Sequence, residues 1–115
     1  MDVAWHGTKL GSPGWSDSGG RALAMTLAAF DGGSDLHIML NMHWESLDFE
    51  LPSVQGRYWL IAVDTSMPSP LDITAFGNER PVVAKWCAVR ARSVVVLVNR
   101  ALKSAGQEEN PVLRC

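Results

Sequence analysis

The feature that most constrains the fold of this chain is the shortness of its apolar segments. Glycine, proline and serine interrupt the sequence at short intervals, and no apolar run approaches the ~20 residues of a membrane-spanning helix. Within the segments, apolar and polar residues alternate with period two, which is the repeat of a β-strand. Many short strands separated by turn residues are typical of an antiparallel sandwich or barrel. We therefore predict an all-β fold, specifically a two-sheet antiparallel β-sandwich.

The predicted strands follow one another without a dividing linker or an internal repeat. Strand patterns occupy residues 3–6, 21–30, 36–44, 47–51, 57–64, 82–89 and 93–98. Residues 11–20 form a loop rich in glycine and serine, and residues 31–35 favour a hairpin turn because glycine reaches positive φ without steric cost. Residues 101–115 are expected to be a tail. Residues 1–115 are thus interpreted as a single β-sandwich domain.

Alternation within the strands predicts which side chains face the core. The pattern is clearest over residues 36–44, where it predicts one buried and one exposed face. The predicted buried residues are Leu36, Ile38, Leu40, Met42 and Trp44, and the predicted exposed residues are His37, Asn41 and His43, with Met39 among them. In the same way, Trp59, Ile61 and Val63 are predicted to share one face. Residues 93–98 are apolar on both faces, as in a covered central strand.

The charge distribution disfavours two classes of partner. The chain has 10 basic and 12 acidic residues and a net charge of −2, and its basic residues are spread out. Nucleic acid requires a basic patch that neutralises phosphates, and an anionic membrane surface requires the same, so neither partner is predicted. Residues 1–7 lack a charged segment leading into an apolar stretch. No signal peptide is therefore expected, and we predict a cytoplasmic location.

The sequence offers no convincing catalytic site. Asp48 and Glu50 lie two residues apart on a predicted strand, which places them ~6.6 Å apart on one face, near the separation of a glycosidase carboxylate pair. Both belong to a polar strand face, however, where nothing in the sequence would desolvate them. The loop over residues 11–20 lacks the Gly-Lys-Ser/Thr ending of a phosphate-binding loop. No catalytic residue and no cofactor are predicted.

Histidine spacing disfavours a metal site. His37 and His43 fall on one strand, but they are six positions apart, a distance of ~20 Å along a strand. That is too far to share an ion that each must approach within ~2.1 Å. His6 would have to fold against one of them, and a third ligand would have to come from elsewhere. No metal ligand is therefore assigned.

Tryptophan is unusually frequent, with five residues in 115. Trp44 and Trp59 fall on predicted apolar strand faces and are expected in the core. Trp5 and Trp15 lie close to glycines and allow two interpretations: packing against neighbouring structure, or an exposed platform. Flat aromatic rings suit the apolar faces of sugars, and the indole N–H is a polar handle. Trp5 and Trp15 are accordingly the candidate binding residues.

Several sequence runs together resemble the C-terminal domain of bacterial glycogen-debranching enzymes, the isoamylase-like branch of the α-amylase superfamily. The most specific is Met-Leu-Asn-Met-His-Trp-Glu-Ser-Leu-Asp-Phe-Glu-Leu-Pro over residues 39–52. Ala-Trp-His-Gly at 4–7 and Pro-Gly-Trp-Ser-Asp at 13–17 are similar to the opening of that domain. Residues 59–73 are similar to its middle, and Ala-Arg-Ser-Val-Val-Val-Leu at 91–97 to its last strand.

The resemblance implies a role for the domain within a larger enzyme. In that family the C-terminal β-sandwich packs against a catalytic (β/α)₈ barrel, and the barrel carries the catalytic carboxylates. The chain is therefore expected to stabilise the barrel of an α-1,6-glucosidase that debranches glycogen, and to meet α-glucan through the parent protein. A docking face is expected on the strand over 21–30, at Ala22, Ala24 and Ala28, with Trp5 and Trp15 as its contacts.

Two alternatives remain open from the sequence. The first is a stand-alone carbohydrate-binding module that uses exposed tryptophans. The second is a protein-interaction sandwich unrelated to sugar. A line of exposed aromatic residues would favour the first alternative, whereas one broad apolar face would favour docking on a barrel.

Overall fold

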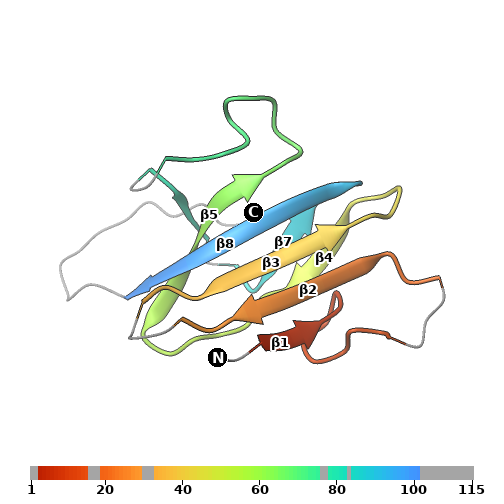
Figure 1. The fold of residues 1–115 in the computed structure, drawn as a ribbon, viewed down its shortest axis with the longest axis horizontal. Helices are drawn as coiled ribbons and strands as arrows, with labels where there is room; N and C mark the ends of the chain where they lie inside the picture. Colours follow the sequence, from red (N-terminus) through yellow and green to blue (C-terminus); the bar gives the residue numbers. More distant parts are fainter. Residues whose placement is uncertain (1–2, 16–18, 30–32, 76–77, 83, 102–115) are drawn as a thin grey trace.

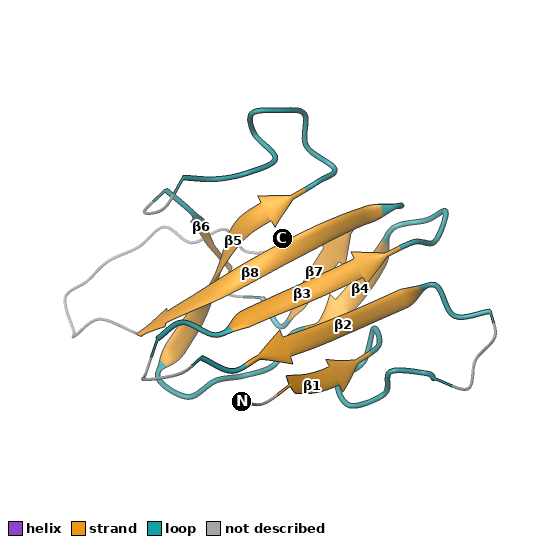
Figure 2. Ribbon diagram, viewed as in Figure 1, coloured by secondary structure: helices purple, strands orange, loops and turns teal. Residues whose placement is uncertain are grey.

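The computed structural model describes residues 3–15, 19–29, 33–75, 78–82 and 84–101. These residues form strands and loops with no helix, and thus no helix that could cross a membrane (Figure 2). The strands are β1 (Val3–His6), β2 (Ala22–Leu27), β3 (Leu36–Asn41), β4 (Leu47–Glu50), β5 (Arg57–Asp64), β6 (Arg80–Val82), β7 (Trp86–Val89) and β8 (Ser93–Ala101). The predicted all-β class is confirmed.

The strands form two antiparallel sheets of unequal size. The large sheet has the order β1-β2-β3-β8-β5-β6, and the small sheet pairs β4 with β7. Figure 1 shows the small sheet lying behind the large one, so that the large sheet turns one face toward the small sheet and the other toward the viewer. We call these the inner face and the outer face. β8 lies between β3 and β5, and its predicted central position is confirmed.

The core lies between the inner face and the small sheet. Met39, Val95 and Leu97 project from the large sheet, and Phe49 and Val89 project from the small one, all at most 2% exposed. Trp59 is 6% exposed and donates its indole Nε1–H to the carbonyl oxygen of Pro52 at 2.8 Å. Its predicted place in the core is confirmed, because the ring is buried and its one polar atom has a hydrogen-bond partner.

The phase of β3 is opposite to the prediction. His37, Met39 and Asn41 point inward and are fully buried, whereas Leu36, Ile38 and Leu40 lie on the outer face and are half-buried. Alternation alone shows that two faces differ, but it does not show which face the rest of the chain covers. Here Nδ1 of His37 and the carboxamide of Asn41 find hydrogen-bond partners, and this offsets the cost of removing these groups from water.

Trp44 also departs from the prediction. β3 ends at Asn41, so Trp44 belongs to the following turn and is 70% exposed. The guanidinium carbon of Arg92 lies 3.8 Å from its ring centroid, a cation–π contact.

Two further strand predictions are corrected by the sheet connections. The predicted strand over 82–89 is two strands: β6 pairs with β5 at the edge of the large sheet, and β7 pairs with β4 in the small sheet. Pro81 lies in β6, an edge position that tolerates a residue without an N–H. A register shift in β5 between Ile61 and Val63 turns Val63 away from the face that carries Trp59 and Ile61. Residues 31–32 of the predicted turn and residues 102–115 of the predicted tail lie outside the described residues, and Ala101 is the last residue of β8.

The carboxamide of Asn41 connects the two sheets at one end of the sandwich. Its Nδ2 donates to the carbonyl oxygens of Glu45 at 2.8 Å, Val89 at 3.0 Å and Arg90 at 3.2 Å. Its Oδ1 accepts the backbone N–H of His43 at 2.8 Å. One buried side chain thus satisfies backbone groups of the β3–β4 turn and of the β7–β8 turn, which would otherwise lose their hydrogen bonds to water.

A second buried amide, Asn99, closes the opposite end. Its Nδ2 donates to the Asp35 carboxylate at 3.0 Å, and its Oδ1 accepts from the Asp35 backbone N–H at 2.9 Å and from Arg57 at 3.1 Å. The backbone N–H of Ala29 also donates to Asp35, at 2.9 Å. These hydrogen bonds, first from Ala29 and then from Asn99, lower the pKa of Asp35 because they favour its ionised form.

The two tryptophans that the sequence placed in the core should differ in their effect on stability. Trp59→Ala leaves a cavity and is expected to cost about 3–5 kcal/mol of unfolding free energy. Trp44→Ala removes an exposed ring and one cation–π contact, and is expected to cost less than about 1 kcal/mol. Urea unfolding of both variants measures the difference. Equal losses would contradict the exposed position of Trp44.

Asn41→Ala is expected to lower the free energy of unfolding by about 2–4 kcal/mol, because backbone groups of two turns lose a buried partner. Asn41→Asp should cost at least as much, because a carboxylate oxygen would then face the carbonyl oxygens of Glu45 and Val89. Ser93→Ala is a matched control: Ser93 is buried opposite Asn41, but its hydroxyl donates only to the carbonyl oxygen of Ala91. A smaller loss in Asn41→Ala than in Ser93→Ala, measured by urea unfolding, would show that the carboxamide does not hold the two turns.

Candidate functional site

The outer face of the large sheet is the most unusual surface of the molecule. Along β1, β2, β3 and the first part of β8, every outward side chain is apolar. Strand pairing places them in adjacent rows: Val3 and Trp5; Leu23, Met25 and Leu27; Leu36, Ile38 and Leu40; Val94, Val96 and Val98. They are half-buried by one another, except Val3 and Trp5, which are exposed. A continuous apolar surface of this kind is typical of an interaction site.

Trp5 and Trp15 meet at the edge of this outer face. Trp5 projects from β1 opposite Met25 and is 40% exposed, while Trp15 belongs to the loop that follows β1 and is 66% exposed. Their ring centroids lie 5.4 Å apart at an interplanar angle of 68°, an edge-to-face contact. Both rings are therefore accessible and in contact with each other.

The predicted alanine docking face lies on the wrong side of the sheet. Ala22 and Ala24 point inward with Thr26, and Ala24 is 1% exposed, whereas Ala28 lies beyond the end of β2. Small side chains at these positions leave room for the histidine rings that pack over β2. The apolar outward side chains of β2 are the larger ones, Leu23 and Met25 among them.

Two grooves are among those that open on the described surface. The first, of about 390 Å³, runs beside the outer face and is lined chiefly by Pro13, Trp15, Arg21, Leu23, Leu40 and Met42. The second, of about 560 Å³, lies between the small sheet and β5 and includes Leu10, Pro52, Val54, Tyr58, Lys85 and Trp86. Both volumes fall within the roughly 300–1,000 Å³ of small-molecule sites.

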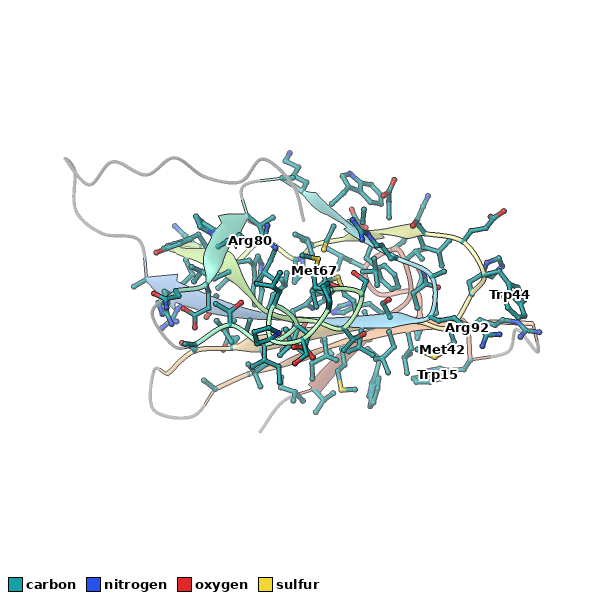
Figure 3. The ribbon with its side chains drawn as sticks, turned by 90° about the horizontal axis from the view of Figure 1, so that it is seen from above. Trp15, Met42, Trp44, Met67, Arg80 and Arg92 are labelled. Atoms are coloured by element: carbon teal, nitrogen blue, oxygen red, sulfur yellow. The ribbon has the colours of Figure 1, made fainter. Side chains whose placement is uncertain are left out.

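Sequence reasoning missed the end of the sandwich where the β3–β4 and β7–β8 turns meet. Figure 3 shows Trp44 and Arg92 at this end of the sandwich, and Met42 belongs to the same turn as Trp44. The backbone N–H of Arg92 donates to the carbonyl oxygen of His43 at 3.2 Å, which joins the two turns. Arg92 has a φ of 54°, a left-handed conformation that is uncommon for a residue with a Cβ. The available signal was the brevity of the turn between Val89 and Ser93.

The acidic pair does not form a catalytic arrangement. Asp48 is exposed on the outer side of the small sheet. Glu50 is half-buried, and its carboxylate accepts the backbone N–H of Leu10 at 2.9 Å. That hydrogen bond fastens the loop after β1 to the small sheet. Glu50 thus has a structural role, and Asp48 is exposed to solvent.

Two histidines do come together, but with a hydroxyl between them. The hydroxyl of Thr26 lies 3.1 Å from Nε2 of His6 and 2.9 Å from Nδ1 of His37, and the two rings are 5.7 Å apart. His43 lies in the turn after β3, away from this pair. Within the described ranges, no group of three His, Cys, Asp or Glu side chains is placed to hold a metal ion.

The hydrogen bonds define where the protons of this cluster lie. The backbone N–H of Gly11 donates to Nδ1 of His6 at 2.8 Å, so His6 carries its proton on Nε2 and donates to Thr26. Thr26 then donates to Nδ1 of His37, which leaves the His37 proton on Nε2, a buried atom without a hydrogen-bond partner. This chain of donors requires both rings to be neutral.

Burial reinforces that neutral state. Desolvation lowers the pKa of His37 to about 4, and repulsion from His6 acts in the same direction. Desolvation also lowers the pKa of His6. The cluster is therefore a neutral part of the core at physiological pH.

The free energy of unfolding should fall as the pH drops from about 6.5 toward 4. In that range the unfolded chain protonates His37 while the folded chain does not, so acid favours unfolding. One pKa unit corresponds to about 1.4 kcal/mol, so the shift of His37 from 6.5 to about 4 accounts for about 3 kcal/mol. Urea unfolding of His37→Gln between pH 7 and 4 should show a smaller loss. Met39→Leu, an equally buried control in the same strand, should keep the full pH dependence; equal slopes in all three proteins would contradict the assignment.

Comparison with known proteins identifies relatives of this chain. It is 35% identical over 77 residues to isoamylase 2, chloroplastic, from rice (Oryza sativa subsp. japonica). The matched segment covers 60% of this chain but only 10% of the rice protein.

A family match covers most of the fold. The family described as isoamylase 1-3, C-terminal, matches residues 4–99, a span that runs from β1 into β8. It includes the outer face, both tryptophans at its edge, and the turns that carry Trp44 and Arg92. The chain belongs to the family of isoamylase 1-3 C-terminal domains.

Proposed function

We propose that this chain is the non-catalytic C-terminal domain of a glycogen-debranching α-1,6-glucosidase, and that its outer face docks on the catalytic (β/α)₈ barrel and stabilises it. The observation that carries the proposal is the apolar outer face of the large sheet. Its rows of leucine, valine, isoleucine and methionine side chains span β1, β2, β3 and β8 without a charged residue. A face of this composition gains free energy when another apolar surface covers it.

The chemistry of the described residues agrees with a domain that contributes stability while the barrel carries out catalysis. The acidic pair is solvated or engaged by the backbone, and the histidine cluster is a closed network within the core. Hydrolysis of a branch linkage needs two carboxylates flanking the bond. We assign these carboxylates to the barrel, so the parent protein is the glycoside hydrolase and this domain contributes stability.

Trp5 and Trp15 are proposed to be part of the docking contact. They form the margin of the outer face next to β1, so a barrel covering that face would meet their rings. The compartment follows from the substrate: a glycogen-debranching enzyme would act in the cytoplasm, whereas the name of the rice relative places that protein in the chloroplast.

Introducing a charge at the centre of the outer face tests the proposal. In an enzyme that carries this domain, Ile38→Lys should lower the temperature of heat inactivation by several degrees, because a lysine would have to lose its hydration at the barrel contact. In the chain alone, the same change should reduce self-association and binding of a hydrophobic dye, because the face is then uncovered. Heat inactivation, sedimentation and dye fluorescence give the three measurements.

Ala88→Lys is the matched control, because Ala88 is exposed on the small sheet, outside the outer face. It should leave all three measurements unchanged. If the wild-type chain binds no dye and Ile38→Lys unfolds it, the face is covered within the chain and the docking proposal is wrong.

A further inference from the structure

One end of the sandwich presents an aromatic side chain, Trp44, that the docking face does not require. Trp44 and Met42 come from the β3–β4 turn and Arg92 comes from the β7–β8 turn, and we call this set the tryptophan end (Figure 3). Trp44 lies beyond the last residue of β3, outside the rows of the outer face. It is the most exposed large apolar side chain of the described residues, at 70%.

The ring of Trp44 has one covered and one open face. Arg92 stacks on one side with its guanidinium carbon 3.8 Å from the ring centroid. Because the residue is still 70% exposed, the opposite ring face is open to solvent. A cation–π contact on one face restrains the ring, so that less conformational entropy is lost when a ligand stacks on the other.

The loops that hold this ring are fixed from within. Asn41 binds the carbonyl oxygens of Glu45 and Arg90, one in each turn, and Arg92 binds the backbone of His43. The left-handed backbone of Arg92, at a φ of 54°, costs conformational energy that a glycine would avoid. Backbone strain of this kind occurs most often at functional sites, where the side chain is needed.

Met42 adds an exposed apolar side chain to the same turn. It lies two residues before Trp44 and is 46% exposed. The combination is an open indole face, an apolar neighbour in the same turn and a cationic planar group that can donate hydrogen bonds to neutral hydroxyls.

We propose that the tryptophan end binds a linear segment of an α-1,4-linked glucan, with one glucose ring stacked on the open face of Trp44. The adjoining glucose residues lie along Met42, and Arg92 donates to their hydroxyl groups. A sugar ring has an apolar face and a polar rim, which matches an indole bordered by a guanidinium group. The choice of an α-glucan rests on the proposed function, since the parent enzyme acts on that polymer.

Titration of the chain with maltoheptaose, followed by calorimetry and tryptophan fluorescence, tests this site. We expect binding of maltoheptaose and none of cellohexaose, whose β-1,4 linkages give the chain a different shape from that of an α-1,4-linked segment. Trp44→Ala should weaken maltoheptaose binding at least tenfold without changing the melting temperature by more than a few degrees. Trp86→Ala is the matched control: Trp86 is 43% exposed in the groove between the small sheet and β5, and its loss should leave binding unchanged.

Arg92→Gly separates a binding role from a structural one. Glycine accepts a φ of 54° without strain, so the melting temperature should stay the same or rise. Maltoheptaose binding should nevertheless fall several-fold, because both the stacked partner of Trp44 and a donor are lost. A lower melting temperature with unchanged binding would show that Arg92 serves the fold alone.

The remaining outcomes also decide the proposal. Absence of maltoheptaose binding, binding that survives Trp44→Ala, or binding that is lost in Trp86→Ala would each overturn it. None of these results bears on the docking face, which is measured without sugar through Ile38→Lys. Conversely, failure of the docking experiment leaves the sugar titration readable on its own.

Discussion

The arrangement of both sheets at one end depends on the buried carboxamide of Asn41. It lies at the end of β3, and its four hydrogen bonds reach the turn that enters the small sheet and the turn that leaves it. A hydrophobic side chain could fill the same space but could not pair with those backbone groups, and unpaired buried carbonyls are costly. The turns carry Trp44 and Arg92, and these exposed residues have defined positions because the core holds the turns in place. Internal packing and surface chemistry are thereby linked through one residue.

The large sheet is apolar on both faces, and each face is used differently. The inner face mixes apolar side chains with hydrogen-bonded polar ones such as His37 and Asn99, and the small sheet covers it. The outer face is more uniformly apolar, yet its side chains are only half-buried. The two-stranded small sheet packs on the inner face and leaves the outer face of the six-stranded sheet without a matching layer. The core is therefore closed by the small sheet, whereas the apolar rows of the outer face stay half-exposed, and the docking proposal rests on this difference.

Because the large sheet is apolar on both faces, the sequence predicts where its strands lie but not which face is covered. Strand positions and the all-β class followed from local alternation, which depends only on the backbone repeat. The phase of β3 did not follow, because alternation cannot show which of two faces is covered by distant residues. His37 and Asn41 were placed outside since polarity usually indicates exposure, and only the long-range partners Thr26 and Val89 explain their burial. The prediction that Trp44 is a core residue is wrong for a related reason: the predicted strand runs through a turn that Asn41 holds by tertiary hydrogen bonds.

The two proposed surfaces rely on different physics, and so they can coexist on one small domain. Docking through the outer face depends on the apolar area that is buried. Its free energy grows with that area and depends little on which apolar side chains supply it. Stacking at the tryptophan end depends on the orientation of single groups, which must be held in place before a ligand arrives. The apolar area lies where β1, β2, β3 and β8 run side by side. The orientation of Trp44 and Arg92 is fixed where Asn41 joins two short turns. The left-handed Arg92 fits this view, because a sequence selected for stability alone would place glycine there and would lose the guanidinium that holds the Trp44 ring.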